Sequence, residues 1–201
     1  MTIIEFLIKV IKFTGRKAMF LSFQYPRFFK YKLLSSCKQI SGYPKLYQPI
    51  QINGKGKVVF QRNVRIGADP SPFLYSGYAY IDSRKEGSKI EISENCWINN
   101  NFVAISEGEG IEIGSNTLIG SSCEIVDSDF HDFQPDKSMG GVAKIAKVKI
   151  GKNVFIGSNV KILKGVFIGD NSVIGNGSVV TKSIPENVIA AGVPAKVVRS
   201  L

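Results

Sequence analysis

Apolar residues recur every six positions through the C-terminal part of the chain. The lead position of each hexad holds isoleucine or valine, at Ile150, Ile156, Ile162, Ile168, Ile174 and Val180. A second column stands four positions after each lead, at Val154, Val160, Val166, Ser172, Ser178 and Ile184. The two columns are an even number of residues apart, so an extended chain can point both toward one side. This period fits neither a helix nor plain strand alternation, and it predicts short strands separated by regular bends.

Glycine and asparagine mark where the bends fall. Glycine follows four of the leads, at Gly151, Gly157, Gly169 and Gly175, and asparagine or glycine stands three after a lead, at Asn153, Asn159, Gly165, Asn171 and Gly177. These two residue types adopt the left-handed backbone of a tight corner at the lowest cost. One strand and bend cannot bury its own apolar face, whereas stacked units can. The pattern therefore predicts a solenoid.

The repeat is less regular toward the N-terminus, where it begins at about Ile50. Three stretches interrupt it: a Pro/Ser/Gly-rich segment at 68–78, a short insertion at 107–110, and a loop at about 126–147. The loop is required because the spacing from Ile125 to Ile150 is not a multiple of six. Long loops on a rigid scaffold often carry function.

The hexads and the ending AGVPAKVVR (Ala191–Arg199) resemble the hexapeptide-repeat acyltransferases over about residues 50–200. The likeness is to the O-acetyltransferase branch, which includes galactoside, maltose and polysaccharide acetyltransferases. It implies an all-β, left-handed parallel β-helix with three hexads per triangular coil, working as a homotrimer. The left hand follows from the resemblance alone, because crossover connections are generally right-handed.

We expect three regions. Residues 1–48 form a basic, amphipathic, helical N-terminal segment, residues 49–195 form the β-helix acyltransferase domain with its loop at 126–147, and residues 196–201 form a C-terminal tail.

Within the first region, residues 2–16 predict an amphipathic helix, because Glu5, Lys9, Lys12 and Arg16 share one face. A second apolar and basic stretch, 18–34, is rich in aromatic residues. Two interpretations stay open: the segment caps the end of the solenoid, or it contacts an anionic membrane. Its apolar runs are too short to span a bilayer. We expect a cytoplasmic protein, peripheral on the inner face of the membrane if the second interpretation holds.

The formal net charge of +10 is concentrated in this segment, where residues 1–38 hold eight basic residues and one acid. The rest of the chain is only mildly basic, which argues against nucleic acid as a partner. Cys96 and Cys123 fall in the second hexad column and predict buried thiols in a reducing compartment. One histidine and scattered cysteines predict no metal site. Trp97 falls at a hexad position that points out of the predicted solenoid, so we expect it to be a subunit contact or a surface residue.

His131, the only histidine, lies in the long loop. An ordinary solvated loop histidine is the plainer interpretation of the residue alone. However, imidazole suits proton removal near neutral pH, and Asp127, Asp129 and Asp132 are near enough in sequence to orient or stabilise it. The resemblance also places a catalytic histidine in this loop. We therefore predict that His131 acts as a general base in direct acetyl transfer.

The remaining site residues follow from the resemblance. It implies acetyl-CoA as co-substrate and a sugar or glycan acceptor, with the acceptor contacted by Asn100, Asn101, Glu107, Glu109 and Asp129. As plain turn residues, the asparagines would only shape a corner. The expected cofactor contacts lie in the C-terminal half, at Gly157, Ser158, Asn176, Gly177, Thr181, Lys182, Pro194, Lys196 and Arg199. The cations in this set would complement nucleotide phosphates, or be solvated tail charges.

The leading hypothesis is an acetyl-CoA-dependent O-acetyltransferase acting on a sugar hydroxyl in cell-surface polysaccharide synthesis. N-acetylation of an amino sugar and acetylation of a xenobiotic alcohol are the alternatives within the same chemistry. A non-catalytic trimeric scaffold is the contrasting class, and it predicts no loss of turnover on His131→Ala.

Overall fold

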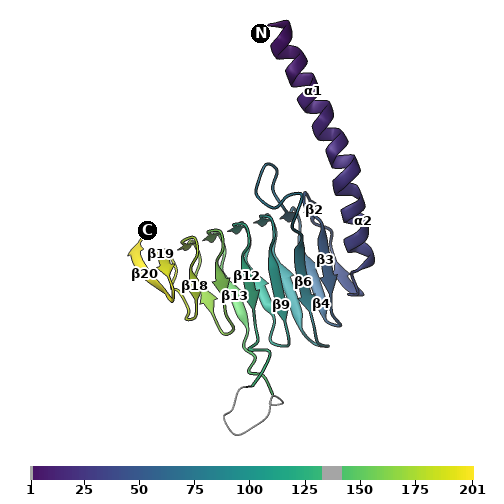
Figure 1. Cartoon of the computed structure of the whole chain (residues 1–201). Coiled ribbons are helices and arrows are strands. Elements are labelled where there is room, and N and C mark those ends of the chain that lie inside the picture. The colour runs from purple at the N-terminus through teal and green to yellow at the C-terminus, as the bar shows by residue number, and fades with distance from the viewer. Residues whose placement is uncertain (1, 133–141) are drawn as a thin grey trace.

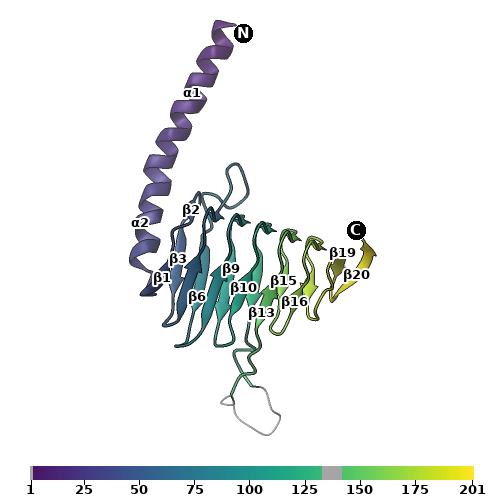
Figure 2. The same ribbon diagram turned by 180° about the vertical axis from the view of Figure 1, so that it is seen from behind.

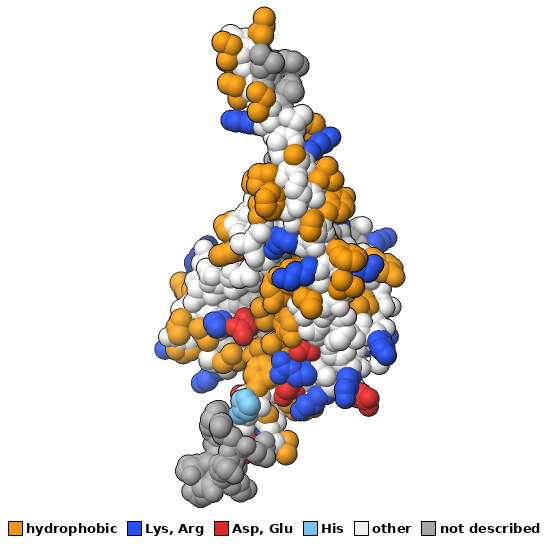
Figure 3. Space-filling view, turned by 45° about the vertical axis from the view of Figure 1, so that its right-hand side comes forward, with side chains coloured by type: hydrophobic (Ala, Val, Ile, Leu, Met, Phe, Trp, Pro, Cys, Tyr) orange, Lys and Arg blue, Asp and Glu red, His pale blue; other side chains and the backbone are white. Residues whose placement is uncertain are grey.

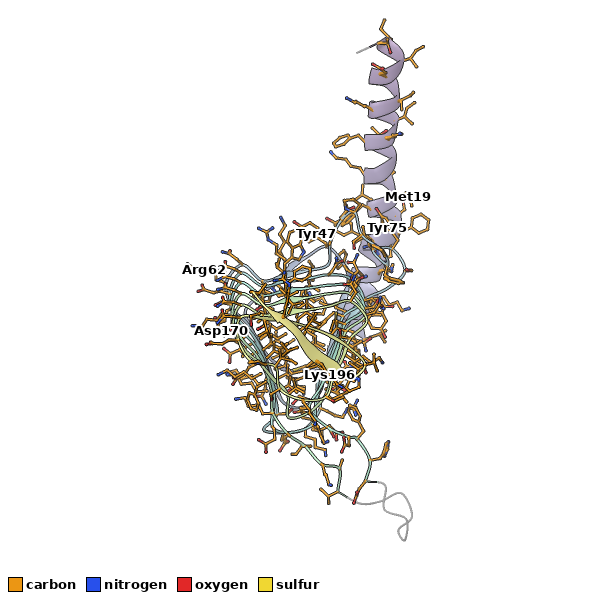
Figure 4. The ribbon with its side chains drawn as sticks, turned by 90° about the vertical axis from the view of Figure 1, so that its left-hand side faces the viewer. Met19, Tyr47, Arg62, Tyr75, Asp170 and Lys196 are labelled. Atoms are coloured by element: carbon orange, nitrogen blue, oxygen red, sulfur yellow. The ribbon has the colours of Figure 1, made fainter. Side chains whose placement is uncertain are left out.

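The computed structural model describes residues 2–132 and 142–201. Short strands stack into a three-sided prism, and a long helical segment projects from its N-terminal end (Figures 1 and 2). Figure 4 looks along the stack and shows the strands outlining the sides around an interior filled with side chains. The predicted solenoid of parallel strands is confirmed.

Three sheets form the sides of the prism, and successive strands of the chain pass from sheet A to sheet B to sheet C. Sheet A comprises β1 (Gln39–Ser41), β4 (Lys57–Phe60), β7 (Lys89–Ile92), β10 (Ile111–Ile113), β13 (Val148–Ile150) and β16 (Phe167–Ile168). Sheet B comprises β2 (Lys45–Leu46), β5 (Arg65–Ile66), β8 (Trp97–Ile98), β11 (Leu118–Ile119), β14 (Phe155–Ile156), β17 (Val173–Ile174), β19 (Val188–Gly192) and β20 (Ala195–Ser200). Sheet C comprises β3 (Ile50–Asn53), β6 (Ala79–Ser83), β9 (Val103–Ser106), β12 (Glu124–Val126), β15 (Lys161–Ile162) and β18 (Val179–Val180).

Neighbouring strands pair in parallel throughout, apart from the closing antiparallel pair β19–β20. Parallel register places identical hexad positions on top of one another, as in the pairing of Ile113 with Ile150 and of Ile150 with Ile168. These lead residues are almost completely buried. Burying each such side chain contributes roughly 1.5–3 kcal/mol, so the stacked columns supply the core that a single coil lacks.

The corners carry the left-handed residues that the sequence predicts. At the corner between sheets A and B, hereafter the A–B corner, asparagines with φ of 55–59° stack from coil to coil. Their side chains form a ladder in which Asn153 donates to Asn171 (3.1 Å) and Asn171 donates to Asn187 (2.9 Å). The B–C and C–A corners are named in the same way.

The N-terminal segment is one nearly continuous helical arm of residues 3–33. It consists of α1 (Ile3–Met19), a π-helical turn η1 (Phe20–Gln24) and α2 (Tyr25–Leu33). Helix α1 therefore continues beyond the predicted residues 2–16, and the first coil starts with β1, before residue 49, because β1 pairs with β4. No helix in the described part of the chain is long and apolar enough to cross a membrane.

Candidate functional site

His131 follows β12 at the C–A corner, at the start of the loop between β12 and β13. Strands β6, β9 and β12 lie side by side and end at this corner, so the residues after each strand gather there. His131 is exposed, and its backbone N–H bonds the carbonyl of Asp129 at 2.7 Å. The described parts of the loop leave the prism on the side opposite the helical arm (Figure 1).

Asp127 fixes the shape of this corner. Its carboxylate is fully buried and accepts hydrogen bonds from the Ser106 hydroxyl (2.6 Å) and from the backbone N–H groups of Glu107 (2.7 Å) and Gly110 (2.8 Å). Burying a carboxylate is costly unless donors satisfy its oxygens, as these three do. The acid therefore holds the short insertion at 107–110 in place beneath the loop that carries His131.

Glu107 joins the same corner to two cations. Its carboxylate accepts from the Ser128 hydroxyl at 2.9 Å and pairs with Arg84 (3.3 Å) and Lys85 (3.6 Å). Burial by itself raises the pKa of this carboxyl group, but the Ser128 hydrogen bond and the two cations outweigh burial and hold the pKa below its ordinary value. Glu107 is thus anionic at neutral pH, whereas Glu109 points to solvent.

Arg84 links this network to the histidine loop. It also pairs with Asp82 at 3.0 Å, and its guanidinium lies 5.2 Å from the centre of the Phe130 ring, next to His131 in sequence. One oxygen of Asp82, Oδ1, is buried without a hydrogen-bond donor. Sequence reasoning missed Arg84 and Asp82, because nothing in a hexad pattern shows which corner residues of different coils meet.

Asp129 is tied to the next coil. Its carboxylate pairs with Lys164 at 3.0 Å, and Lys164 follows β15 at the same C–A corner. Thr181 and Lys182 follow β18, so they also lie along this corner and are exposed. Predicted acceptor and cofactor residues therefore share this edge with His131.

The remaining predicted cofactor residues line a different edge. Gly157, Ser158 and Asn176 belong to a groove of about 500 Å³ at the B–C corner, together with Trp97, Leu118 and Phe155 from the outer face of sheet B. The three apolar side chains are 39–49% exposed and stack in register. An extended chain with an apolar side suits such a groove, since apolar side chains form one wall of it and the polar residues Asn99, Ser158 and Asn176 line the rest.

Gly157 is needed for the close packing of this corner. A Cβ at Gly157 would lie 2.2 Å from Oδ1 of Asn176, the oxygen that accepts a hydrogen bond from the Ser158 N–H at 2.8 Å. Glycine therefore allows the coils to approach here. Gly177 follows Asn176 at the same corner. Pro194 lies in the turn between β19 and β20. This turn begins beside the corner, because the backbone N–H of Gly192 donates to the Ser178 hydroxyl at 3.2 Å. Lys196 and Arg199 are exposed on β20.

Asn100 and Asn101 are both engaged within the chain. Asn100 is fully buried, and its amide bonds the carbonyls of Pro72 (2.8 Å) and Ala68 (3.0 Å) in the segment 68–78. Asn101 donates its side-chain N–H to Ser122 at 3.1 Å. Asn99, which sequence reasoning did not select, lines the groove instead and accepts a hydrogen bond from Ser71 at 2.8 Å. The segment 68–78, expected only as an excursion, thus contributes Ala68 to the lining of the groove.

The predicted residues therefore lie in two groups at opposite edges of sheet C, which we call the two half-sites of the predicted site. His131, Glu107, Asp129 and Lys182 lie at the C–A corner, and the groove lies at the B–C corner. Extended strands rise about 3.3 Å per residue, so strands such as β9 (Val103–Ser106) keep the two edges roughly 10 Å or more apart within one chain. Within residues 2–132 and 142–201, no three His, Cys, Asp or Glu side chains are placed to hold a metal ion.

Comparison with known proteins identifies the class. The profile of the hexapeptide repeat of succinyl-transferase matches residues 147–182. Galactoside O-acetyltransferase of Escherichia coli is 33% identical over 171 residues, which are 82% of this chain and 79% of that protein. Galactoside O-acetyltransferase of Lactococcus lactis is 37% identical over 131 residues, 55% of this chain and 63% of that one.

A solved structure gives the same result. The N-acyltransferase AntD from Bacillus cereus, in complex with dTDP and 3-hydroxybutyryl-CoA, superposes with a TM-score of 0.59 at 25% identity, over 83% of this chain and 82% of that one. This chain belongs to the hexapeptide-repeat acyltransferases. It is an enzyme of that class, and its coils form the left-handed parallel β-helix of the family.

Proposed function

We propose that this protein is an O-acetyltransferase that moves an acetyl group from acetyl-CoA to a sugar hydroxyl in the synthesis of a cell-surface polysaccharide. The observation that carries the proposal is the 33% identity to a galactoside O-acetyltransferase across most of both chains. The groove at the B–C corner supports the cofactor part, because its apolar wall and its polar lining residues fit a pantetheine arm.

His131 acts as the general base in this proposal. Its neutral imidazole takes the proton of the acceptor hydroxyl while that oxygen attacks the thioester carbonyl. A backbone N–H of a neighbouring coil stabilises the tetrahedral oxyanion. The C–S bond then breaks, and the CoA sulfur leaves with the proton returned by the imidazolium. No acyl-enzyme forms, and holding both substrates in one cleft supplies much of the rate.

The two half-sites belong to different copies of the chain in this proposal. In a trimer, the C–A corner of one copy meets the B–C corner of the next, which brings His131 to the thioester. Asn99 and Glu107 then approach the acceptor from opposite sides. This arrangement is supported by the separation of the half-sites across sheet C.

The role of His131 is tested by steady-state kinetics with acetyl-CoA and a panel of glycans, following thiol release. We expect His131→Ala to fold and to lose about 10²–10⁴-fold in turnover, the usual contribution of a general base. Val142→Ala, a change at a residue of the same loop that is 91% exposed, is the matched control and should keep full activity. If His131→Ala and Val142→Ala had equal turnover, the role of His131 as general base would be rejected.

N-acetylation of an amino sugar is the second candidate. A Bacillus cereus N-acyltransferase structure with 25% identity and a TM-score of 0.54 contains dTDP-4-amino-4,6-dideoxyglucose and coenzyme A. Hydroxylamine separates the two products, since it cleaves an acetyl ester and leaves an amide intact. A hydroxylamine-resistant product from the best acceptor would replace our first proposal with the second.

A further inference from the structure

The helical arm has two parts with different relations to the prism. Helix α2 packs on β3 at the end of the solenoid. Helix α1 extends away from the prism, as the two opposite views in Figures 1 and 2 show. A segment that only capped the solenoid would bury its apolar face there. The capping role therefore belongs to α2 and leaves the apolar face of α1 to be explained.

Helix α1 is amphipathic, with a basic polar face. Ile4, Ile8 and Ile11 lie on one side at helical spacing and are 46–69% exposed. Lys9 lies on the other side, and Lys12, four residues after Ile8, lies at the border between the two faces. Residues 1–38 contain eight basic residues and a single acid, so this part of the molecule attracts anionic surfaces.

The arm is held rigidly to the prism at its base. Gln24 is fully buried and donates to the carbonyl of Leu74 at 2.8 Å, and Arg27 donates to the same carbonyl at 3.1 Å. Tyr31 stacks on Tyr78 with ring centres 4.2 Å apart. These contacts join the arm to the segment 68–78, whose first residue, Ala68, lines the groove of the B–C corner.

Exposed apolar side chains occur both on the arm and on that segment. Met19, Leu21 and Phe23 of the arm are exposed, as are Phe73 and Tyr75 of segment 68–78. The hydrogen bond from Gln24 to Leu74 holds the two segments together just below α1, where Figure 4 labels Met19 and Tyr75. Figure 3 shows apolar side chains running from the arm onto the prism with Lys and Arg between them. Aromatic and basic residues side by side are typical of surfaces that sit at lipid headgroups.

A second copy of the chain is a poorer occupant for this face. The apolar groove at the N-terminal end of the prism, about 280 Å³, is lined by residues such as Phe28, Ile40 and Leu46, with Lys32 beside them and no acid. The groove therefore offers no negative charge to another α1, whose polar face carries Lys9 and Lys12 with Glu5 as its single acid. Anionic lipids supply the missing negative charge.

We propose that α1 lies in the interface of an anionic lipid bilayer, with Ile4, Ile8 and Ile11 in the acyl region and the lysines at the headgroups. Segment 68–78 reaches the same surface through Phe73 and Tyr75. This interaction goes beyond the proposed transfer reaction and does not depend on it. It places the groove of the B–C corner on the membrane side of the enzyme.

Co-sedimentation of the full-length protein with extruded vesicles tests the proposal. We expect binding to vesicles with about 30% phosphatidylglycerol at low salt, weaker binding to pure phosphatidylcholine, and weaker binding at high salt, because the Debye length falls to roughly 3 Å at 1 M. The double variant Ile8→Gln/Ile11→Gln should lose binding at every salt concentration, since it removes apolar surface without changing charge.

Two charge variants give the matched comparison. Lys9→Gln/Lys12→Gln should bind phosphatidylglycerol vesicles about 10–30-fold less tightly, because each base near an anionic surface contributes about 1 kcal/mol. Lys57→Gln/Lys149→Gln removes the same charge from exposed positions of sheet A and should bind like the wild type. Equal losses in both variants would mean attraction by net charge only and would overturn the proposal.

Two further outcomes would also overturn it: a wild-type protein that stays in the supernatant at low salt, or an Ile8→Gln/Ile11→Gln variant whose molar mass in solution falls. The second result would assign α1 to a contact between copies. Thiol release with a soluble acceptor should be unchanged in all these variants. Because vesicle binding needs no turnover, failure of the reaction and failure of the lipid contact are distinguishable.

Discussion

Asp127 and His131 stand four residues apart, yet the corner uses them in different ways. Asp127 is buried among backbone and hydroxyl donors, so it holds the insertion at 107–110. His131 is exposed at the edge where the strands of sheet C end. Only a side chain that can reach substrate can exchange a proton with it, which is why the general base is proposed at His131 and a positioning role follows for Asp127.

The cysteines illustrate the same dependence of chemistry on position. Cys96 and Cys123 are buried in the second hexad column, as the sequence predicts, and all three cysteines are unpaired. Burial raises the pKa of each of these two thiols from about 9 to about 11. Cys37 lies between α2 and β1 and is only half-buried.

We expect a thiol reagent at pH 8 to label Cys37 first and to leave Cys96 and Cys123 unmodified in the folded protein. The thiolate is the reactive form, and a thiol with a pKa near 11 is almost wholly protonated at pH 8. The stability that comes from burying neutral thiols is complete below pH 9 and is lost as pH rises toward 11. Mass spectrometry after labelling checks this, with Cys37→Ser as the control that should take up no label. Native labelling of all three residues would contradict it.

At the scale of elements, the corners determine how each hexad turns into the next. Asparagine adopts the left-handed conformation and also bonds the asparagine of the neighbouring coil, as Asn153 does with Asn171. The corner is thus stabilised within its own coil and between coils. Short strands of two to four residues, such as β14 and β15, could not hold a register without such corners.

Substitution of Asn153 tests this account. We expect Asn153→Ala to lower the free energy of unfolding by about 1–3 kcal/mol, because alanine is strained at positive φ and the bond to Asn171 is lost. Asn153→Gly should lose less, since glycine accepts that backbone conformation. Lys152→Ala, at the adjacent exposed position, should change it by less than about 0.5 kcal/mol. Urea denaturation measures all three, and an alanine variant as stable as the lysine control would refute the role of the corner.

For the whole molecule, the central feature is that one chain separates the two groups of residues that the proposed reaction must bring together. The histidine edge and the groove edge flank sheet C, and the arm extends on the side away from the histidine loop. In the proposed trimer, a closed ring of copies would join the two edges by symmetry without any change in the fold of a single chain. The proposed active site is therefore a property of the assembly.

Mixed assemblies test that property. Ser158→Phe should block the groove, and His131→Ala should remove the base, so each variant alone is expected to be inactive. Co-expression in equal amounts should restore roughly a quarter of wild-type activity, because random assortment in a ring places an intact base beside an intact groove at about one interface in four. Light scattering should give a molar mass of about three times 22.0 kDa for every sample. Inactive mixed trimers would place both half-sites of one reaction in one chain.

Much of the architecture was determined by the sequence alone. Period-six columns such as Ile150 and Ile156 predict stacked coils, and the corner asparagines predict the bends, because burial of apolar residues and left-handed backbone are local requirements that a residue type satisfies by itself. The same reasoning gave the buried thiols and the position of the loop that carries His131. The spacing of apolar and charged residues also predicted the amphipathic helix α1.

Only the tertiary structure decided which corner residues meet. Stacking brings Arg84 to Glu107 and Ser71 to Asn99, although each pair is separated by more than one coil of sequence with irregular insertions. It also commits Asn100 to the segment 68–78, and divides the arm into a capping α2 and an exposed α1. These outcomes depend on the register of coils against one another, which the length of each insertion sets and a repeat pattern does not encode.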